Sequence, residues 1–235
     1  MLKSYSFGVE TMRWMEIIET YIKEHSIEEA RIVYEQHVIN ANSASLSIQF
    51  CNRFKNADVR KHQEIVIKSY NARHYYNFAK VANGANIKLL KESALVLKDA
   101  DVAILFASHY PEFGIEAEQE FIISLNDPKY ACLFAQSVPG CDVKRLEQIV
   151  IDSNDYKLAY YFACGVKGAD IEKLEDIVIA SNDAEYIYYF ALNVKGANKA
   201  KLKKALLSIG DVFRVLDYNV NVEYIEHDEI KAASF

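Results

Sequence analysis

The chain has little glycine and proline for its length. Eight glycines and three prolines occur among 235 residues, whereas a loop-rich β-sandwich needs turn residues at short intervals. Helices are the simpler interpretation of a chain that is 51% hydrophobic and long enough to bury a sizeable core. We therefore predict an all-α protein.

The sequence also lacks the features of an oxidised or membrane-bound protein. Its four cysteines form no CxxC pair and show no metal-ligand spacing. No segment approaches the roughly 18 consecutive apolar residues of a membrane span, and the N-terminal residues show no signal-peptide pattern. We expect a reduced, cytoplasmic protein that makes no contact with a membrane.

Catalytic motifs and an excess of positive charge are missing too. The sequence contains no GxGxxG, GxxxxGK, GxSxG or HExxH, the patterns that cradle phosphates, expose a nucleophile or bind zinc. Lysine and arginine total 27 against 33 aspartates and glutamates, for a net charge of −6, which does not favour nonspecific phosphate binding. We predict that the protein is not an enzyme and needs no cofactor.

What the chain does contain is an internal repeat. The dipeptide Phe-Ala recurs every 28 residues, at Phe78, Phe106, Phe134, Phe162 and Phe190. A side chain that commonly caps the start of a helix recurs with the same period, at Ser43, Asn71, Asp99, Asp127, Asp155, Asp183 and Asp211. Each of these positions predicts the start of a helix that carries the repeat phenylalanine on its buried face.

A second helix is predicted in each unit. Glycines such as Gly168 and Gly196 are expected to close the first helix, and a second series of capping residues comes after them, at Asp58, Asn86, Asp142, Asp170 and Asn198. Apolar residues then recur at helical spacing, as in Leu174, Ile177 and Val178. One unit is thus a helical hairpin with half a core, which its neighbours must complete.

These periods predict a right-handed α-solenoid of about seven hairpins. The seven units span residues 22–217, residues 1–21 form an N-terminal capping helix, and residues 218–235 form a C-terminal cap or tail. The first unit departs from the pattern but offers Ser26 and Glu29 as a capping box. In the fourth unit, residues 110–114 replace the usual turn, which indicates a bend or a functional feature.

The repeat resembles a known kind of sequence. The strings FACGVKGADIEKLEDIVIASNDAEYIYYFALNVKGA and FAQSVPGCDVKRLEQIVIDSNDYKLAYYFA are similar to a tandem two-helix repeat of bacterial and bacteriophage proteins, over roughly residues 38 to 210. The resemblance implies a helical-repeat interaction protein, and it brings no catalytic residues with it.

Aromatic side chains are the most suggestive surface candidates. Paired tyrosines precede the repeat phenylalanine, and one of each pair is expected to line the core while the other faces outward. Stacked units would bring Tyr160 and Tyr188 side by side. The pairs either pack between helices or form an aromatic stripe for a partner. The predicted partner-binding residues are Tyr76, Tyr110, Phe113, Tyr160 and Tyr188.

Histidines and basic residues suggest two further kinds of site. His37 and His62 could face each other across neighbouring second helices, but no third ligand occurs in phase, so no metal site is predicted. Basic residues such as Arg60, Lys61 and Lys88 could bind nucleic acid together with tyrosines, although acidic residues interrupt this track further along the chain.

The sequence therefore favours a non-catalytic scaffold that binds another protein. Given the resemblance, the scaffold would be an adaptor or an inhibitor that a bacteriophage directs against a host protein. A helical-repeat protein that binds nucleic acid is the alternative.

Overall fold

The computed structural model describes residues 26–223, and these residues contain α-helices and no strand. The predicted all-α class is confirmed for this part of the chain. The expected capping helix, residues 1–21, and residues 224–235 of the expected C-terminal segment lie outside the described residues. The fourteen α-helices of residues 26–223 are α2 (Ile27–Asn40), α3 (Ala44–Arg53), α4 (Val59–Ile67), α5 (Ala72–Val81), α6 (Ile87–Val96), α7 (Ala100–His109), α8 (Glu116–Leu125), α9 (Pro128–Ser137), α10 (Val143–Ser153), α11 (Tyr156–Gly165), α12 (Ile171–Ala180), α13 (Ala184–Asn193), α14 (Lys199–Ile209) and α15 (Val212–Tyr218).

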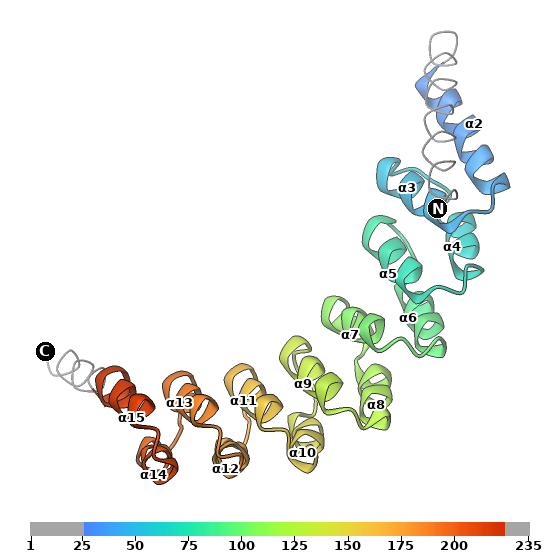
Figure 1. The fold of residues 1–235 in the computed structure, drawn as a ribbon. Coiled ribbons are helices and arrows are strands. Elements are labelled where there is room, and N and C mark those ends of the chain that lie inside the picture. Colours follow the sequence, from blue (N-terminus) through green and yellow to red (C-terminus); the bar gives the residue numbers. More distant parts are fainter. Residues whose placement is uncertain (1–25, 224–235) are drawn as a thin grey trace, which may run out of the picture. The chain divides into compact units, whose positions relative to one another are not determined.

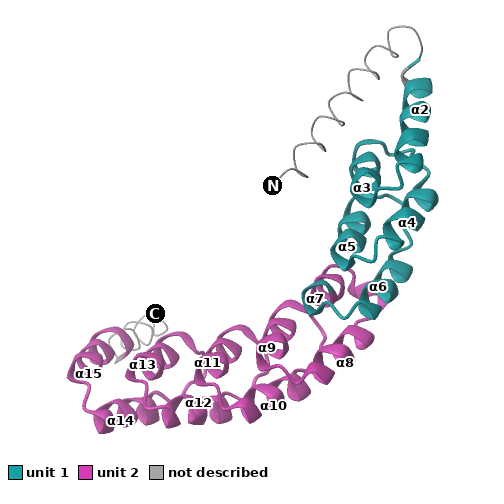
Figure 2. Cartoon of the chain, turned by 45° about the vertical axis from the view of Figure 1, so that its right-hand side comes forward, with its two compact units in different colours: residues 1–102 teal, residues 103–235 magenta. Residues whose placement is uncertain are grey.

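The chain divides into two compact units, residues 1–102 and 103–235, whose boundary falls within α7 (Figure 2). Inside each unit the helices form two rows (Figure 1). In the second unit α9, α11, α13 and α15 make one row, and α8, α10, α12 and α14 make the other. In the first unit α3 contacts α5, while α4 contacts α2.

The predicted capping residues begin the helices. All seven residues of the first capping series accept a hydrogen bond from a backbone N–H in the first turn of the next helix. All five of the second series do the same. Ser26 and Glu29 form the expected capping box at the start of α2. Each cap satisfies an N–H that has no partner inside its helix.

The ends of the first helices differ from the prediction. The helix that carries Phe190 ends at Asn193, and Val194 is already extended. Gly196 does have a positive φ of 88°, but it lies in the subsequent turn, which the Ala197 N–H closes by donating to the Val194 carbonyl at 3.3 Å. The glycine therefore serves a β-turn of the kind that needs a positive φ at its third residue, and not the helix end itself.

The core lies between the two rows. The repeat phenylalanines of the first unit, Phe50 and Phe78, are at most 1% exposed, and the leucine of the second helix, Leu90, is fully buried. The second unit repeats this arrangement with Phe106, Phe134, Phe162 and Phe190 against Leu146, Leu174 and Leu202. Replacing one such phenylalanine with alanine would cost about 3–5 kcal/mol. Tyr218 occupies the phenylalanine position in α15 and is 1% exposed.

The irregular turn of the fourth 28-residue repeat is a short 3₁₀ helix, η1 (Pro111–Phe113). The next helix, α8, begins after Ile115, whose side chain cannot cap it. At the end of the described residues, η2 (Asn219–Glu223) continues α15 as a π-helical turn.

Candidate functional site

A second hydrogen-bond series links neighbouring hairpins and has no counterpart in the sequence prediction. In five of the second helices, α2, α4, α8, α10 and α12, a buried Glu or Gln accepts from the backbone N–H of the capping residue 23 positions later. Helix α6 has Lys91 at the corresponding position. The donor and acceptor pairs are Asp58 to Glu35, Asn86 to Gln63, Asp142 to Gln119, Asp170 to Glu147, and Asn198 to Glu175. We call this series the carboxyl ladder. Within each compact unit it fixes a second helix against the next one, and so sets the spacing of the first helices there.

The first helices of the second unit present a group of tyrosines on this frame. Helix α11 contributes Tyr156, Tyr160 and Tyr161, and α13 contributes Tyr186 and Tyr189. These five residues are named the tyrosine cluster. Tyr161 is 50% exposed and the other four are half-buried. The cluster is therefore a surface that a partner can reach.

The rings of the tyrosine cluster contact one another across the two helices. Tyr186 lies edge-on to Tyr156 at 5.2 Å and to Tyr160 at 5.6 Å between ring centroids. Tyr160 also packs beside Tyr161 at 5.2 Å and Tyr189 at 6.4 Å. Edge-to-face and tilted pairs at these separations are the stable arrangements of aromatic rings. The cluster is continuous from α11 to α13.

Hydrogen bonds hold the hydroxyls in place. Tyr156 donates to Asp183 Oδ2 at 3.0 Å, and Tyr189 donates to Glu185 Oε1 at 2.8 Å. Tyr160 accepts from Asn193 Nδ2 at 2.9 Å. A hydrogen bond with Tyr161, with burial as the next cause, raises the pKa of Tyr186 to about 12, so this phenol keeps its proton to a higher pH than a free tyrosine does.

Cations flank the cluster at both helices. Lys157 Nζ lies 5.8 Å from the ring of Tyr156 and 5.7 Å from that of Tyr186. The Arg214 guanidinium, from α15, lies 5.9 Å from the ring of Tyr189 and donates to Glu185 at 3.2 Å. These distances from cation to ring centroid fall within cation–π range. The rim of the cluster thus carries both signs of charge.

The structure places the five predicted partner-binding residues differently from one another. Tyr160 belongs to the tyrosine cluster, whereas Tyr188 is 7% exposed and its hydroxyl accepts from Asn221 at 3.1 Å. Tyr76, in α5, is 5% exposed. Phe113 is 44% exposed in η1, and Tyr110 is half-buried with its ring 6.0 Å from that of Phe106.

The rings that contact Tyr160 are not the one expected from the sequence, which was Tyr188. The ring contacts of Tyr160 are with Tyr161, Tyr186, Tyr189 and Phe190, while Tyr188 contacts the ring of Tyr189. Tyr156 and Tyr186 were missed as surface candidates. The signal for both was their place in the first turn of α11 and α13, close to the capping aspartates. From there Tyr156 reaches Asp183 at the start of α13, and Tyr186 reaches back to α11.

His62 is buried beside a carboxylate in the first unit. It is 0% exposed, stacks on Phe50 at 5.1 Å, and holds its Nε2 3.4 Å from Glu35 Oε1. That separation is too long for a good hydrogen bond, and neither ring nitrogen has a hydrogen-bond partner in the described residues. Burial lowers the pKa of His62, with Glu35 acting in the opposite direction. The residue is therefore uncharged at neutral pH.

The cysteines, the potential metal ligands and the apolar helices form no further candidate site among the described residues. All four cysteines are free, and burial raises the pKa of Cys51 to about 12 and that of Cys132 to about 11. Among residues 26–223, no three His, Cys, Asp or Glu side chains gather in a way that could hold a metal ion. Within the same residues no helix is both long and apolar enough to cross a membrane.

Comparisons of the chain with protein-family models, with curated proteins and with solved structures found no match.

Proposed function

We propose that the protein is a non-catalytic helical-repeat scaffold that binds another protein through the tyrosine cluster. The observation that carries this proposal is the cluster itself: five tyrosine rings from two helices, continuous, partly exposed and held by hydrogen bonds. Tyrosine gives a large contact area and has few rotatable bonds to immobilise. A surface whose rings are already held loses less conformational entropy when a partner binds.

The scaffold would be a right-handed α-solenoid of about seven hairpins. Two series of helix caps with a 28-residue period and the carboxyl ladder between hairpins support this architecture. In such a stack each hairpin contacts its neighbours only, and a surface built on two hairpins is rigid because the core beneath it is shared.

A protein fits the rim of the cluster better than a nucleic acid does. Lys157 and Arg214 over tyrosine rings resemble the mixture of cations and aromatics in single-strand binding proteins. Asp183 and Glu185 lie on the same rim, however, and accept hydrogen bonds from the cluster hydroxyls. Their negative charge would repel phosphates, whereas a protein can offer charges of both signs.

The resemblance of the repeat to those of bacterial and bacteriophage proteins suggests which protein to look for. We propose a bacterial host protein as the partner, with the chain acting as an inhibitor or an adaptor.

Capture of a partner from a bacterial lysate, repeated with two variants, tests the proposal. Tyr161→Ala should weaken capture about tenfold or more, because exposed interface tyrosines are frequent hot spots, while its melting temperature stays close to that of the parent. Tyr70→Ala is the matched control, since Tyr70 is 80% exposed in the first unit and lies outside the cluster. Its capture should be unchanged.

Two outcomes would contradict the proposal. Equal capture by the parent and Tyr161→Ala would remove the cluster from the interface. Retardation of labelled RNA or DNA that weakens steeply with salt and depends on Lys157 would favour the nucleic-acid alternative.

A further inference from the structure

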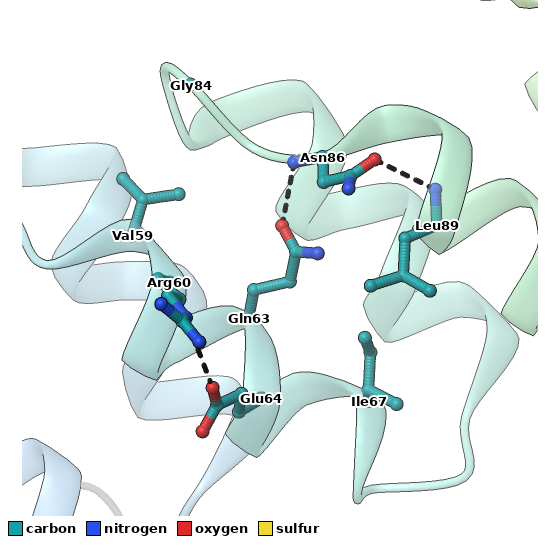
Figure 3. Close-up of a pocket in the computed structure, with 8 residues that line it drawn as sticks. All are labelled: Val59, Arg60, Gln63, Glu64, Ile67, Gly84, Asn86 and Leu89. Atoms are coloured by element: carbon teal, nitrogen blue, oxygen red, sulfur yellow. Dashed lines mark hydrogen bonds and ion pairs between the residues drawn. The ribbon is translucent and has the colours of Figure 1, made fainter.

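The first unit contains a pocket between two second helices, α4 and α6. Its volume is about 420 Å³, and Figure 3 shows its lining. Val59, Ile67 and Leu89 give it apolar walls, while Arg60 and Glu64 stand on the α4 side. Next to them the Asn86 N–H donates to Gln63 Oε1 at 2.8 Å, which is one rung of the carboxyl ladder.

In the second unit two of the three corresponding places between second helices are bridged by ion pairs, α8 to α10 and α12 to α14. Between α10 and α12, Lys173 pairs with Asp170 instead. Arg145 of α10 forms a fork with Glu120 of α8, at 2.5 Å from Nη1 to Oε1 and 3.0 Å from Nη2 to Oε2. Lys201 of α14 pairs with Asp176 of α12 in the same register. In both pairs the acid precedes the base by 25 residues.

The pocket in the first unit keeps the acid of this bridge and lacks the base. Glu64 is in phase with Glu120 and Asp176, and the residue 25 positions after it is Leu89. That position holds a base in four of the six other 28-residue repeats, and valine or alanine, Val33 and Ala117, in the other two. The bases are Lys61, Arg145, Lys173 and Lys201. Leu89 is 42% exposed, so its apolar side chain is not needed to complete the core.

Within the part of the chain that the structure describes, Glu64 has only a weak ion-pair partner. Its carboxylate lies 3.6 Å from Arg60 Nε, and the side chains are 59% and 91% exposed. The pair is four residues apart on one helix with the base first, which is the less favourable order. An exposed pair of this kind contributes little to stability, so an incoming cation can displace Arg60 into solvent.

We propose that this pocket binds an arginine side chain of the partner protein. The guanidinium takes the place that Arg145 has against Glu120 and forms two hydrogen bonds with Glu64. The aliphatic part of the arginine lies along Leu89, Ile67 and Val59. The inference rests on the proposed function, and it names the chemistry of one contact in the first unit, made by residues outside the tyrosine cluster.

The test uses a small probe, so it does not depend on knowing the partner. N-acetyl-L-arginine amide is titrated into the ¹⁵N-labelled full chain, and the backbone amides of Gly84, Asn86 and Leu89 are followed by NMR. The amides are expected to shift in a saturable way with arginine. Capped citrulline, which has the same shape without the charge, and capped leucine should bind about tenfold more weakly or not at all.

Three variants make the assignment specific. Leu89→Arg supplies the missing base from within the chain, so it should close the pocket and abolish the shifts while the melting temperature is kept. Glu64→Gln should weaken binding about tenfold or more. Glu120→Gln, which alters the corresponding acid of the second unit, should leave the shifts at Gly84, Asn86 and Leu89 unchanged.

Equal binding of arginine, citrulline and leucine, or shifts that persist in Leu89→Arg, would overturn the proposal. So would the absence of any saturable shift. These results would leave the proposed function standing if capture of a partner still depended on Tyr161. Loss of that dependence, with arginine binding intact, would instead remove the tyrosine cluster and keep the pocket.

Discussion

At the scale of single residues, the residue just before the capping residue of each first helix has an unusual backbone conformation. In seven successive 28-residue repeats this residue has a positive φ, between 49° and 82°. Five of the seven are residue types that tolerate the left-handed region, namely Asn42, Asn126, Asn154, Asn182 and Gly210. The other two are Tyr70, with φ of 49°, and Lys98, with φ of 54°.

We expect Tyr70→Asn to stabilise the protein. A non-glycine side chain in the left-handed region costs roughly 1–2 kcal/mol, and asparagine recovers part of this because its short polar side chain forms local hydrogen bonds. The Tyr70 ring is 80% exposed, so little packing is lost. The gain should be about 0.5–1 kcal/mol in the free energy of unfolding, measured by urea denaturation.

Tyr70→Ala serves as the control, because it removes the ring but keeps a Cβ that is poorly suited to a positive φ. It should gain less than Tyr70→Asn. At the corresponding position of the second compact unit, Asn154→Ala removes the asparagine and should lower the free energy of unfolding. If Tyr70→Asn is neutral and Tyr70→Ala is stabilising, the exposed ring and not the backbone is the source of the strain.

Individual capping residues were predictable from the sequence, and the carboxyl ladder was not. A cap acts on a backbone N–H two or three residues away, so its chemistry is visible in a short stretch such as Asp155 to Leu158. A ladder acceptor such as Glu175 acts on a residue 23 positions later. From its own helix it looks like one more exposed charge, and only the packing of the next hairpin shows that it is 1% exposed.

At the scale of helices, the carboxyl ladder should be a main source of register between hairpins. Glu147 in α10 accepts from the Asp170 N–H that precedes α12, at 2.6 Å, and is 6% exposed. Replacing it with leucine would leave that N–H buried without a partner, at a cost of about 1–3 kcal/mol. Glutamine keeps an acceptor, as Gln63 and Gln119 do at the same position in other units.

The comparison of Glu147→Gln with the parent should depend on pH. Burial raises the pKa of Glu147, against the effect of the hydrogen bond from Asp170. The folded chain therefore holds a proton on this carboxyl more readily than the unfolded chain, so the parent loses stability as the pH rises from the unfolded pKa through the folded one. Glutamine does not titrate in this range.

Thermal unfolding of Glu147→Gln, Glu147→Leu and the parent, measured from pH 4 to pH 8, checks both expectations. Relative to the parent, Glu147→Gln should gain melting temperature as the pH rises, and Glu147→Leu should be less stable than Glu147→Gln throughout. If the melting temperature of Glu147→Gln instead falls relative to that of the parent as the pH rises, the charge on Glu147 stabilises the folded chain, and folding lowers the pKa of this carboxyl.

Helix ends were harder to predict than helix starts. Val194, Lys195 and Gly196 contain the expected glycine, but the first helix ends before them because Val194 takes an extended conformation. Its side chain is 4% exposed, so burial of the valine decides where the helix stops. The position of the helix end is thus set by packing between helices, which the sequence around the glycine does not show.

At the scale of the whole molecule, the exposure of each tyrosine depends on the hairpin that packs after it. Helical periodicity places Tyr160 and Tyr188 at equivalent positions, yet Tyr160 is half-buried and Tyr188 is 7% exposed. Asn193 and Asn221 donate to the hydroxyls of Tyr160 and Tyr188 in the same way. The difference is that the Arg214 guanidinium lies over the ring of Tyr188, whereas Tyr186, 28 residues earlier, packs edge-on against Tyr160. The repeat predicts the position of a side chain, and the neighbour determines whether it is accessible.

The proposed stack predicts that one whole unit can be removed. Deleting residues 127–154 joins Asn126 to Asp155, which restores the local sequence Asn-Asp, with φ of 49° at Asn126 in place of 54° at Asn154. Gln119 is then 23 residues before Asp170 in the shortened chain, the spacing that it now has to Asp142. All five residues of the tyrosine cluster lie outside the deleted segment, and the deletion removes one contact to them, the hydrogen bond from Gln136 to the Tyr161 carbonyl.

We expect the shortened chain to fold cooperatively, with the same helical signal per residue in circular dichroism and a lower melting temperature, because one hairpin and one interface are gone. It should still capture the partner. Deleting only residues 141–154 removes α10 and leaves the apolar faces of α9 and α11 without their second helix, so this smaller deletion should be far more damaging. If both deletions unfold the chain to the same extent, the 28-residue hairpin is not its structural unit, because a stack of such hairpins tolerates the loss of a complete unit and not of half of one.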